Sequence, residues 1–363
     1  MDIRPVFPNF QRPVLIAGPC SAETEAQVLS TAHALAEQDI DLFRAGIWKP
    51  RTRPDSFEGV GAKGLAWLRR VKEETGLKVT TEVANANHVY EALKYGIDVL
   101  WVGARTTVNP FSVQEIADAL RGADVPVLVK NPINPDLKLW MGAIERLYKA
   151  GITRLAAIHR GFSYFGETRY RNVPRWQIPL ELKRHFPDMQ LICDNSHICG
   201  RRDLLLEVAQ KALDLNFDGL MTEVHPTPDK AWSDATQQLT PVDFVHMVDQ
   251  LVVRQPTTDD TDFLETLDNL RHQIDELDEE LFQILGQRMQ VAERIGLYKR
   301  RNNISIFQPH RWAQIIEKAV IKGRQWGLSR EFVEVLFKAI HDESINHQER
   351  VMKAANNELN VER

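Results

Sequence analysis

Short apolar runs alternate with longer amphipathic stretches between Pro13 and about Arg254, and this alternation constrains the fold more than any other feature of the chain. Each run is rich in valine, isoleucine and leucine, as the buried strands of parallel sheets are, and each is followed by a stretch of helical periodicity. Eight such units in about 240 residues favour a closed (β/α)8 barrel over an open doubly wound sheet. The expected strands are residues 14–17, 42–45, 79–83, 99–102, 127–130, 154–158, 191–194 and 220–224.

The chain changes character after residue 254. Residues 255–262 are polar, include Pro256 and lack an apolar period, so they are interpreted as a linker between a barrel domain of residues 1–254 and a helical domain of residues 263–363. Leucines and isoleucines then recur at spacings of three and four, which predicts a long helix with one apolar seam. Further helices are expected at 311–326 and 330–354, and such unequal helices favour a homodimer joined through this domain. The seam consists of Leu267, Leu270, Ile274, Leu277, Leu281 and Ile284.

Charge and composition exclude several classes of protein. A formal net charge of -5 argues against a nucleic-acid partner, because such a partner usually requires a strongly basic surface. No apolar run approaches the roughly 20 residues of a membrane span, and the first residues do not resemble a signal peptide, so the chain is expected in the cytoplasm and not in a membrane. In that compartment the three cysteines favour thiol or metal chemistry over disulfides.

Polar side chains recur where the predicted strands end. In a parallel barrel these positions surround the active site. Because an unpaired buried charge is very costly, cations at the ends of apolar strands predict a bound anion with phosphate or carboxylate groups. Any one of them could instead be an ordinary surface charge. The residues concerned are Cys20, Arg44, Lys49, Arg51, Glu82, Arg105, Lys130, Arg160, His197 and Glu223.

A mixed sulfur, nitrogen and oxygen ligand set is the second prediction for this end of the barrel. Cys20, His197, Glu223 and Asp234 follow the first, seventh and eighth strands, which become neighbours when the barrel closes. Such a set accepts one divalent ion of Mn, Fe, Co or Zn. Taken alone, Cys20 is more often a small buried hydrophobic residue and His197 a structural one, and Cys199 is a rival ligand.

Six motifs of the barrel resemble 3-deoxy-D-arabino-heptulosonate 7-phosphate (DAHP) synthase of the short I-beta type, over nearly all of residues 5–250. They are residues 18–21, 44–52, 81–83, 103–105, 194–203 and 223–226. The resemblance implies a metal-dependent condensation of phosphoenolpyruvate with erythrose 4-phosphate, with the metal on Cys20, His197, Glu223 and Asp234. It also implies that Arg44, Lys49, Arg105, Lys130 and Arg160 bind phosphoenolpyruvate, that Lys49, Pro50, Arg51 and Thr52 bind erythrose 4-phosphate, and that Lys49 and Glu82 are catalytic, Glu82 by positioning water.

The related 3-deoxy-octulosonate 8-phosphate synthases share the barrel and phosphoenolpyruvate but take a five-carbon sugar phosphate. Their signature after the lysine is typically Ala-Asn-Arg. This chain has Pro50, Arg51 and Thr52 after Lys49, which favours the four-carbon substrate.

Cations also interrupt the seam of the long helix. Arg288 lies on the seam. Lys299 projects about 20 degrees from Arg288 around the helix axis, so both side chains lie on the same face of the helix. Arg271 projects roughly 100 degrees away and could serve a pocket in a partner chain. The positions of Arg271, Arg288, Lys299, Arg311, Ser344 and Gln348 resemble the all-helical chorismate mutase class.

That second resemblance implies that Arg288, Arg311 and the second subunit's Arg271 bind the carboxylates of chorismate. Lys299 and Gln348 would stabilise the ether oxygen as its bond breaks, and Ser344 would line the pocket. Where the family commonly has an aspartate and a glutamate, this chain has Gln308 and Trp312. The alternatives are a dimerisation seam with surface cations, or a regulatory module that senses chorismate or prephenate.

Overall fold

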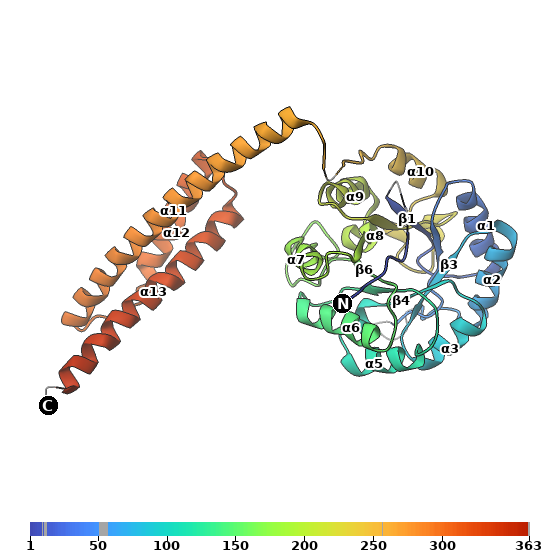
Figure 1. The fold of residues 1–363 in the computed structure, drawn as a ribbon, viewed down its shortest axis with the longest axis horizontal. Helices are drawn as coiled ribbons and strands as arrows, with labels where there is room; N and C mark the ends of the chain where they lie inside the picture. Colours follow the sequence, from blue (N-terminus) through green and yellow to red (C-terminus); the bar gives the residue numbers. More distant parts are fainter. Residues whose placement is uncertain (9, 11–12, 51–56, 256, 362–363) are drawn as a thin grey trace. The chain divides into compact units, whose positions relative to one another are not determined.

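The computed structural model describes residues 1–8, 10, 13–50, 57–255 and 257–361, without the side chains of 355–361, and it divides into two compact units, Met1–Pro256 and Thr257–Arg363. The first unit is a closed barrel of parallel strands that pair in chain order, with β8 returning to pair with β1 (Figure 1). The predicted fold is therefore confirmed, with strand ends that differ by one residue. The strands are β1 (Val14–Gly18), β2 (Leu42–Arg44), β3 (Val79–Val83), β4 (Val99–Val102), β5 (Val127–Lys130), β6 (Leu155–His159), β7 (Gln190–Cys193) and β8 (Gly219–Glu223).

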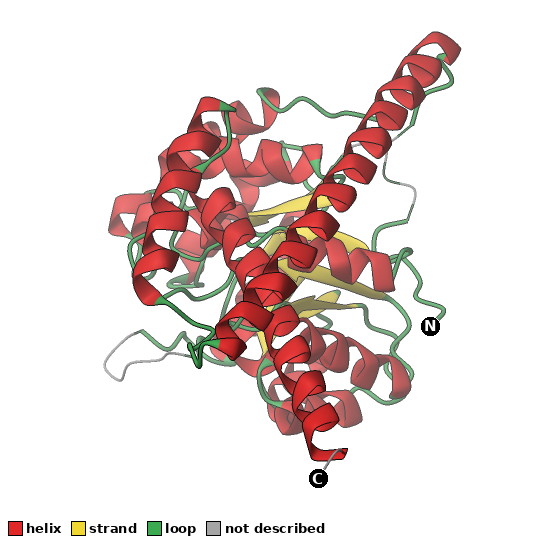
Figure 2. Ribbon diagram, turned by 90° about the vertical axis from the view of Figure 1, so that its left-hand side faces the viewer, coloured by secondary structure: helices red, strands yellow, loops and turns green. Residues whose placement is uncertain are grey.

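Alternate residues of the strands face two different apolar environments. Val99 and Trp101 belong to a small cluster that fills the barrel, whereas Leu100 and Val102 belong to the large cluster between strands and helices. Both faces of the strands are buried, which explains why the runs are apolar almost throughout rather than alternating. Figure 2 shows the strands surrounded by helices in this unit.

Several helices of the barrel begin at residues whose side chains cap them. Thr24, Asn85 and Asp136 each accept a hydrogen bond from a backbone N–H in the first turn of the helix that follows. Two short helices, α4 and α8, directly follow β4 and β7 and add to the repeating pattern. The helices are α1 (Glu25–Ala36), α2 (Lys63–Thr75), α3 (Ala86–Lys94), α4 (Ala104–Thr107), α5 (Pro110–Ala119), α6 (Leu137–Lys149), α7 (Gln177–His185), α8 (Asn195–Cys199), α9 (Leu205–Asp214) and α10 (Pro241–Asp249), with 3-10 turns η1 (Arg202–Leu204), η2 (Pro228–Lys230) and η3 (Ala235–Gln237).

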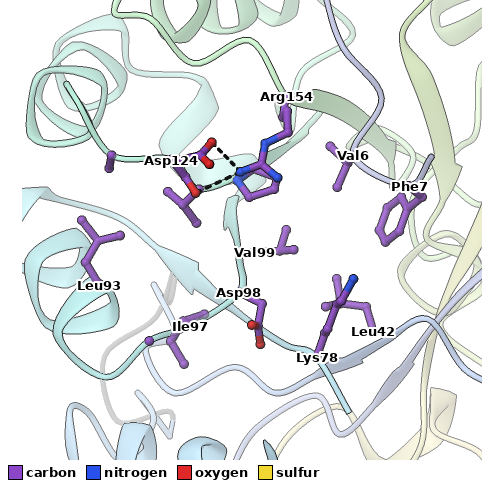
Figure 3. Close-up of a pocket in the computed structure, with 14 residues that line it drawn as sticks. Val6, Phe7, Leu42, Lys78, Leu93, Ile97, Asp98, Val99, Asp124 and Arg154 are labelled. Carbon is purple, nitrogen blue, oxygen red and sulfur yellow. Dashed lines mark hydrogen bonds and ion pairs between the residues drawn. The ribbon is translucent and has the colours of Figure 1, made fainter. Parts of the chain in front are cut away.

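A cavity of about 620 Å³ lies where the strands begin, at the end of the barrel opposite to the predicted site (Figure 3). Leu42 and Val99 line it, together with Phe7 from the N-terminal segment. Its arginine, Arg154, is paired with Asp124 at 2.6 Å. The cavity lies at the amino ends of the strands, the end of such barrels that contributes to stability rather than to catalysis.

The second unit consists of α11 (Thr261–Arg301), α12 (Pro309–Gln325) and α13 (Arg330–Val361). Helix α11 begins at Thr261 because the side chain of Asp260 accepts a hydrogen bond from the N–H of Phe263 at 3.1 Å, so two residues assigned to the linker are helical. At Gly296 a Cβ would lie 3.0 Å from the Cα of Gln348, and the glycine allows α11 and α13 to pack closely. None of the described helices is long and apolar enough to cross a membrane.

Most of the predicted seam is uncovered within one chain. Leu270, Ile274, Leu277, Leu281 and Ile284 are 48–64% exposed, and the buried residues of α11 are confined to Met289, Ala292 and Gly296 among the described side chains. Helices α12 and α13 therefore cover only the C-terminal part of α11.

Candidate active sites

Two cations at the carboxyl ends of the strands lie close to the ring of a buried tryptophan. Arg44 and Lys130 are the last residues of β2 and β5 and are 1% and 4% exposed. The Arg44 guanidinium lies 5.1 Å and the Lys130 ammonium 5.6 Å from the ring centre of Trp101. Arg44 Nη2 is 3.1 Å from Glu223 Oε1, and Lys130 Nζ is 2.6 Å from Asp194 Oδ2. The fold thus gathers residues from four strands into one polar centre.

Arg160 extends this centre on the side of β6. It follows the last residue of that strand, is 7% exposed, and donates from Nη1 to Asn172 Oδ1 at 2.7 Å. Burial lowers the pKa of Arg160 to about 10, and the nearby charges of Arg171 and Arg105 act in the same direction. A group of guanidinium ions that destabilise one another is stabilised by a bound anion. Arg105 is exposed on α4 close to this group.

Cys20, Glu223 and Asp234 form a compact cluster in which one potential ligand atom of each lies within 4.8 Å of the others. Cys20 Sγ donates to Asp234 Oδ2 at 3.3 Å, and Lys49 Nζ lies 3.1 Å from the same sulfur. Asp234 adopts a left-handed backbone conformation with φ of 50°. A non-glycine residue held there is typical of functional positions.

His197 lies beside this cluster but outside it. Its Nδ1 atom is 2.9 Å from Asp194 Oδ2 and 3.7 Å from Glu223 Oε1. The rival ligand Cys199 is 1% exposed and belongs to the apolar core, as does Cys193. Of the four predicted ligands, the structure therefore brings three together and places the fourth next to Glu223.

The chemistry of these residues fits a divalent metal. Burial, reinforced by the charge of Glu223, raises the pKa of the Cys20 thiol to about 12. Glu223 Oε1 is buried and lacks a hydrogen-bond partner among the described residues, although it faces Arg44. A thiol and two carboxylates with an imidazole nearby are ligands that Mn, Fe, Co and Zn accept.

The remaining predicted residues of the barrel lie around this centre or outside the described residues. Lys49 Nζ also donates to the carbonyl oxygen of Cys20 at 2.9 Å. Glu82 Oε2 accepts from Trp101 Nε1 at 3.1 Å, and a Cβ at Gly103 would overlap the Glu82 carboxylate. Pro50 follows Lys49 in the loop after β2, and Arg51 and Thr52 lie outside the described residues.

The helical unit has a cavity of about 310 Å³ between its three helices. Arg288, Lys299, Arg311, Ser344 and Gln348 all line it, as the resemblance to the chorismate mutase class implies. Arg288 Nη1 donates to Ser344 Oγ at 2.5 Å, and Gln348 Oε1 is buried without a hydrogen-bond partner among the described residues. Burial lowers the pKa of Arg288 and of Lys299, because it disfavours their charged forms.

Arg271 does not line this cavity. Its side chain is 64% exposed and pairs with Asp268 of the same helix at 3.1 Å. Gln308 and Trp312, the two departures from the family pattern, do line the cavity, and the Trp312 ring stacks on His341 at 4.1 Å.

Sequence reasoning missed several residues of both sites. Asp194 could have been found, because an acidic residue directly after a buried strand is the same signal that identified Lys130 and Glu223. Trp101 and His341 carry no such signal, since aromatic residues in apolar runs and on amphipathic helices usually pack in the core. Arg171 and Asn172 lie in a long polar loop, where sequence gives no indication of which side chains turn inward.

A (β/α)8 barrel with buried cations and a thiol–carboxylate cluster at the carboxyl ends of its strands defines a class of enzyme that acts on small anions. Comparison with known families gives the particular member of that class. The model of the DAHP synthetase I family matches residues 9–256, and the chain belongs to this family. The model of chorismate mutase type II matches residues 270–349. The resemblances to DAHP synthase and to chorismate mutase are thereby confirmed at the level of the two families.

Individual relatives agree with this assignment. The phospho-2-dehydro-3-deoxyheptonate aldolase of Thermotoga maritima is 33% identical over 226 residues, which cover 62% of this chain and 64% of that protein, just under two thirds of its length. The 2-dehydro-3-deoxyphosphooctonate aldolase of Syntrophotalea carbinolica is 28% identical over 64% of this chain and 86% of that protein. The crystal structure of the Thermotoga maritima DAHP synthase superposes with a TM-score of 0.59 at 30% identity, covering 65% of this chain and 67% of that one.

Proposed function

We propose that the chain is a bifunctional shikimate-pathway enzyme, with a DAHP synthase of the I-beta type in the barrel and a chorismate mutase in the helical unit. The barrel would condense phosphoenolpyruvate with erythrose 4-phosphate to DAHP and phosphate. The helical unit would rearrange chorismate to prephenate. The observation that carries the proposal is that each unit has its own centre of cations, and that among the described side chains only those of the barrel place a thiol and two carboxylates beside it.

In the barrel, the chain's own side chains would bind and orient the two substrates. Arg160, Lys130 and Arg105 would bind the phosphate and carboxylate of phosphoenolpyruvate, with Arg44 alongside, because buried guanidinium and ammonium groups form strong hydrogen bonds to such oxyanions. Lys49 would contact both substrates from its position beside Cys20, and Pro50, Arg51 and Thr52 would hold the sugar phosphate. Holding both reactants in one geometry contributes much of the rate enhancement.

Cys20, His197, Glu223 and Asp234 would hold one divalent ion of Mn, Fe, Co or Zn. When bound, such an ion supplies Lewis-acid polarisation of the aldehyde carbonyl. Carbon C3 of phosphoenolpyruvate would bond to the aldehyde carbon with the electron pair of the C2=C3 double bond, and the aldehyde oxygen would take up a proton to become a hydroxyl group. Glu82 would orient the water that adds at C2 and accept its proton, after which the C2–O bond to phosphate breaks.

In the helical unit, catalysis requires no nucleophile. Arg288, Arg311 and Arg271 of the partner subunit would bind the two carboxylates, and Lys299 with Gln348 would stabilise the ether oxygen as its bond lengthens. Ser344 already orients Arg288 by accepting its hydrogen bond. This arrangement needs a homodimer, and the exposed seam of α11 supports one, because a helix with an exposed apolar seam can bury it against a second copy.

The proposed enzyme works in the cytoplasm. Cys20, Cys193 and Cys199 are free thiols, which a reducing compartment maintains.

Assays of the purified full-length chain with and without a chelator test the proposal. The chelator should abolish condensation and leave the rearrangement of chorismate unchanged, so that one activity serves as the folding control for the other. Re-addition of Mn²⁺ should restore condensation. Condensation with a five-carbon sugar phosphate in preference to erythrose 4-phosphate would contradict the substrate assignment. Binding of chorismate without its conversion would leave the helical unit a sensing role instead.

A further inference from the structure

The guanidinium of Arg171 contacts the candidate metal site from the loop between β6 and α7. Arg171 Nη1 lies 3.0 Å from Asp234 Oδ1 and donates to Gln237 Oε1 at 2.6 Å. Gln237 is fully buried, and its Nε2 donates to Glu223 Oε2 at 2.7 Å. One arginine is therefore connected to both carboxylates of the cluster, to one directly and to the other through an amide.

These contacts divide the oxygens of each carboxylate between two tasks. On Asp234, Oδ1 faces Arg171, while Oδ2 faces the sulfur of Cys20 at 3.3 Å. On Glu223, Oε2 accepts from Gln237, while Oε1 lies 3.1 Å from Arg44 Nη2 and 3.7 Å from His197 Nδ1. Each carboxylate thus has one oxygen held by Arg171 or Gln237, and its other oxygen faces other residues of the site.

The amide of Gln237 can make this bridge in only one orientation. A guanidinium only donates hydrogen bonds and an ionised carboxylate only accepts them. The amide oxygen must therefore face Arg171 and the amide nitrogen must face Glu223, as observed. Reversing the amide would break both hydrogen bonds, so the chain from Arg171 to Glu223 is fixed in direction.

The backbone of Arg171 is itself anchored beside His197. The N–H of Arg171 donates to the carbonyl of Cys199 at 3.3 Å, and Gly200, with φ of 69°, leaves room for the Arg171 side chain, which a Cβ there would overlap. The next residue, Asn172, donates from Nδ2 to the carbonyl of His197 at 2.6 Å and accepts from Arg160. The loop is thus attached at adjacent residues to α8 and to the anion-binding side of the site.

We propose that Arg171 and Gln237 are positioning residues that hold Asp234 and Glu223 in the arrangement a divalent cation requires. Outer partners of metal ligands orient the ligands before the ion arrives, and their loss typically weakens metal binding by about 10- to 100-fold. The guanidinium also offsets the repulsion between two carboxylates and a thiolate brought within one small site. This inference rests on the proposed metal site of the barrel.

Mn²⁺ binding to the metal-free full-length protein tests the proposal, with free Mn²⁺ measured by electron paramagnetic resonance. Arg171→Gln should raise the dissociation constant about 10- to 100-fold. Arg169→Gln is the matched control, because Arg169 lies in the same loop, is 52% exposed and pairs with Glu207 rather than with the cluster. The control should bind Mn²⁺ as the unmodified protein does. Gln237→Leu should weaken binding as well, and the double variant should lose less than the product of the two single effects.

The outcomes separate this inference from the proposed function. Equal Mn²⁺ affinity for Arg171→Gln and the unmodified protein would overturn it, as would an equal loss in Arg169→Gln, since the effect would then reflect charge alone. An unmodified protein that binds no Mn²⁺, Fe²⁺, Co²⁺ or Zn²⁺ would instead overturn the metal site on which it rests. If circular dichroism shows that Arg171→Gln is unfolded, Arg171→Lys retains the charge but not the two-point contact, and unchanged affinity in that variant would again refute the inference.

Discussion

Exchange of arginines between subunits gives the sharpest test of the helical unit. Arg288 lines the cavity and is hydrogen-bonded to Ser344, whereas Arg271 lies on the exposed part of α11 and pairs only with Asp268 among the described side chains. In the proposed dimer each site uses its own Arg288 and the partner's Arg271. Alanine at either position should therefore inactivate both sites of a homodimer, but through different subunits.

The expected magnitudes follow from the contacts and from the symmetry. Each substitution removes a charged hydrogen-bond partner of a substrate carboxylate, about 1.5–3 kcal/mol, so kcat/KM for chorismate should fall roughly 10- to 150-fold. When the two variants are co-expressed in equal amounts, about half of the dimers are mixed, and each mixed dimer has one site with both arginines intact. About a quarter of the unmodified mutase activity should therefore return.

Mutase activity is followed through the loss of chorismate absorbance, with Arg294→Ala as the control for removing an exposed arginine from α11. Condensation activity of the same samples reports that the barrel is intact. Mixed samples that are no more active than the mean of the separate variants would refute the shared site. Full activity of Arg271→Ala alone would show that the cavity of one chain is sufficient.

Three further outcomes are expected. Burial, reinforced by the charge of Glu223, raises the pKa of the Cys20 thiol to about 12, so Mn²⁺ should displace close to one proton when it binds. Its affinity should then rise about tenfold per unit of pH between pH 6 and 8. Calorimetry in buffers of different ionisation enthalpy measures the proton release, and binding without proton release would exclude the thiolate as a ligand. Gly103→Ala should lower kcat for condensation at least several-fold without affecting the mutase, since a Cβ there displaces Glu82; an unchanged rate would remove Glu82 from the mechanism. Leu277 is 64% exposed in one chain, and Leu277→Lys should weaken the dimer by roughly 2–4 kcal/mol, because the dimer interface would contain this leucine from both chains. Sedimentation equilibrium should show monomers, and an unaltered dimer would place the interface elsewhere.

The sequence by itself determined the barrel and much of its chemistry, because both are visible in the local pattern of apolar and polar residues. A buried parallel strand must be apolar on both faces, so its end is visible as the point where polar residues return, and Arg44, Lys130 and Glu223 mark such points. Helical spacing likewise placed Arg288 and Lys299 on one face of α11, and the structure brings both to the same cavity.

Only the tertiary structure decided which oxygen of each carboxylate is held by Arg171 or Gln237 and which faces other residues of the site. That division depends on Arg171 and Gln237, which come from different loops and meet because of the way both loops fold over the end of the barrel. The same is true of Trp101, whose ring comes close to both Arg44 and Lys130 only once the barrel closes. Such contacts join residues that are far apart in the sequence and lie in irregular loops. They therefore produce no repeating pattern of apolar and polar residues from which they could be predicted.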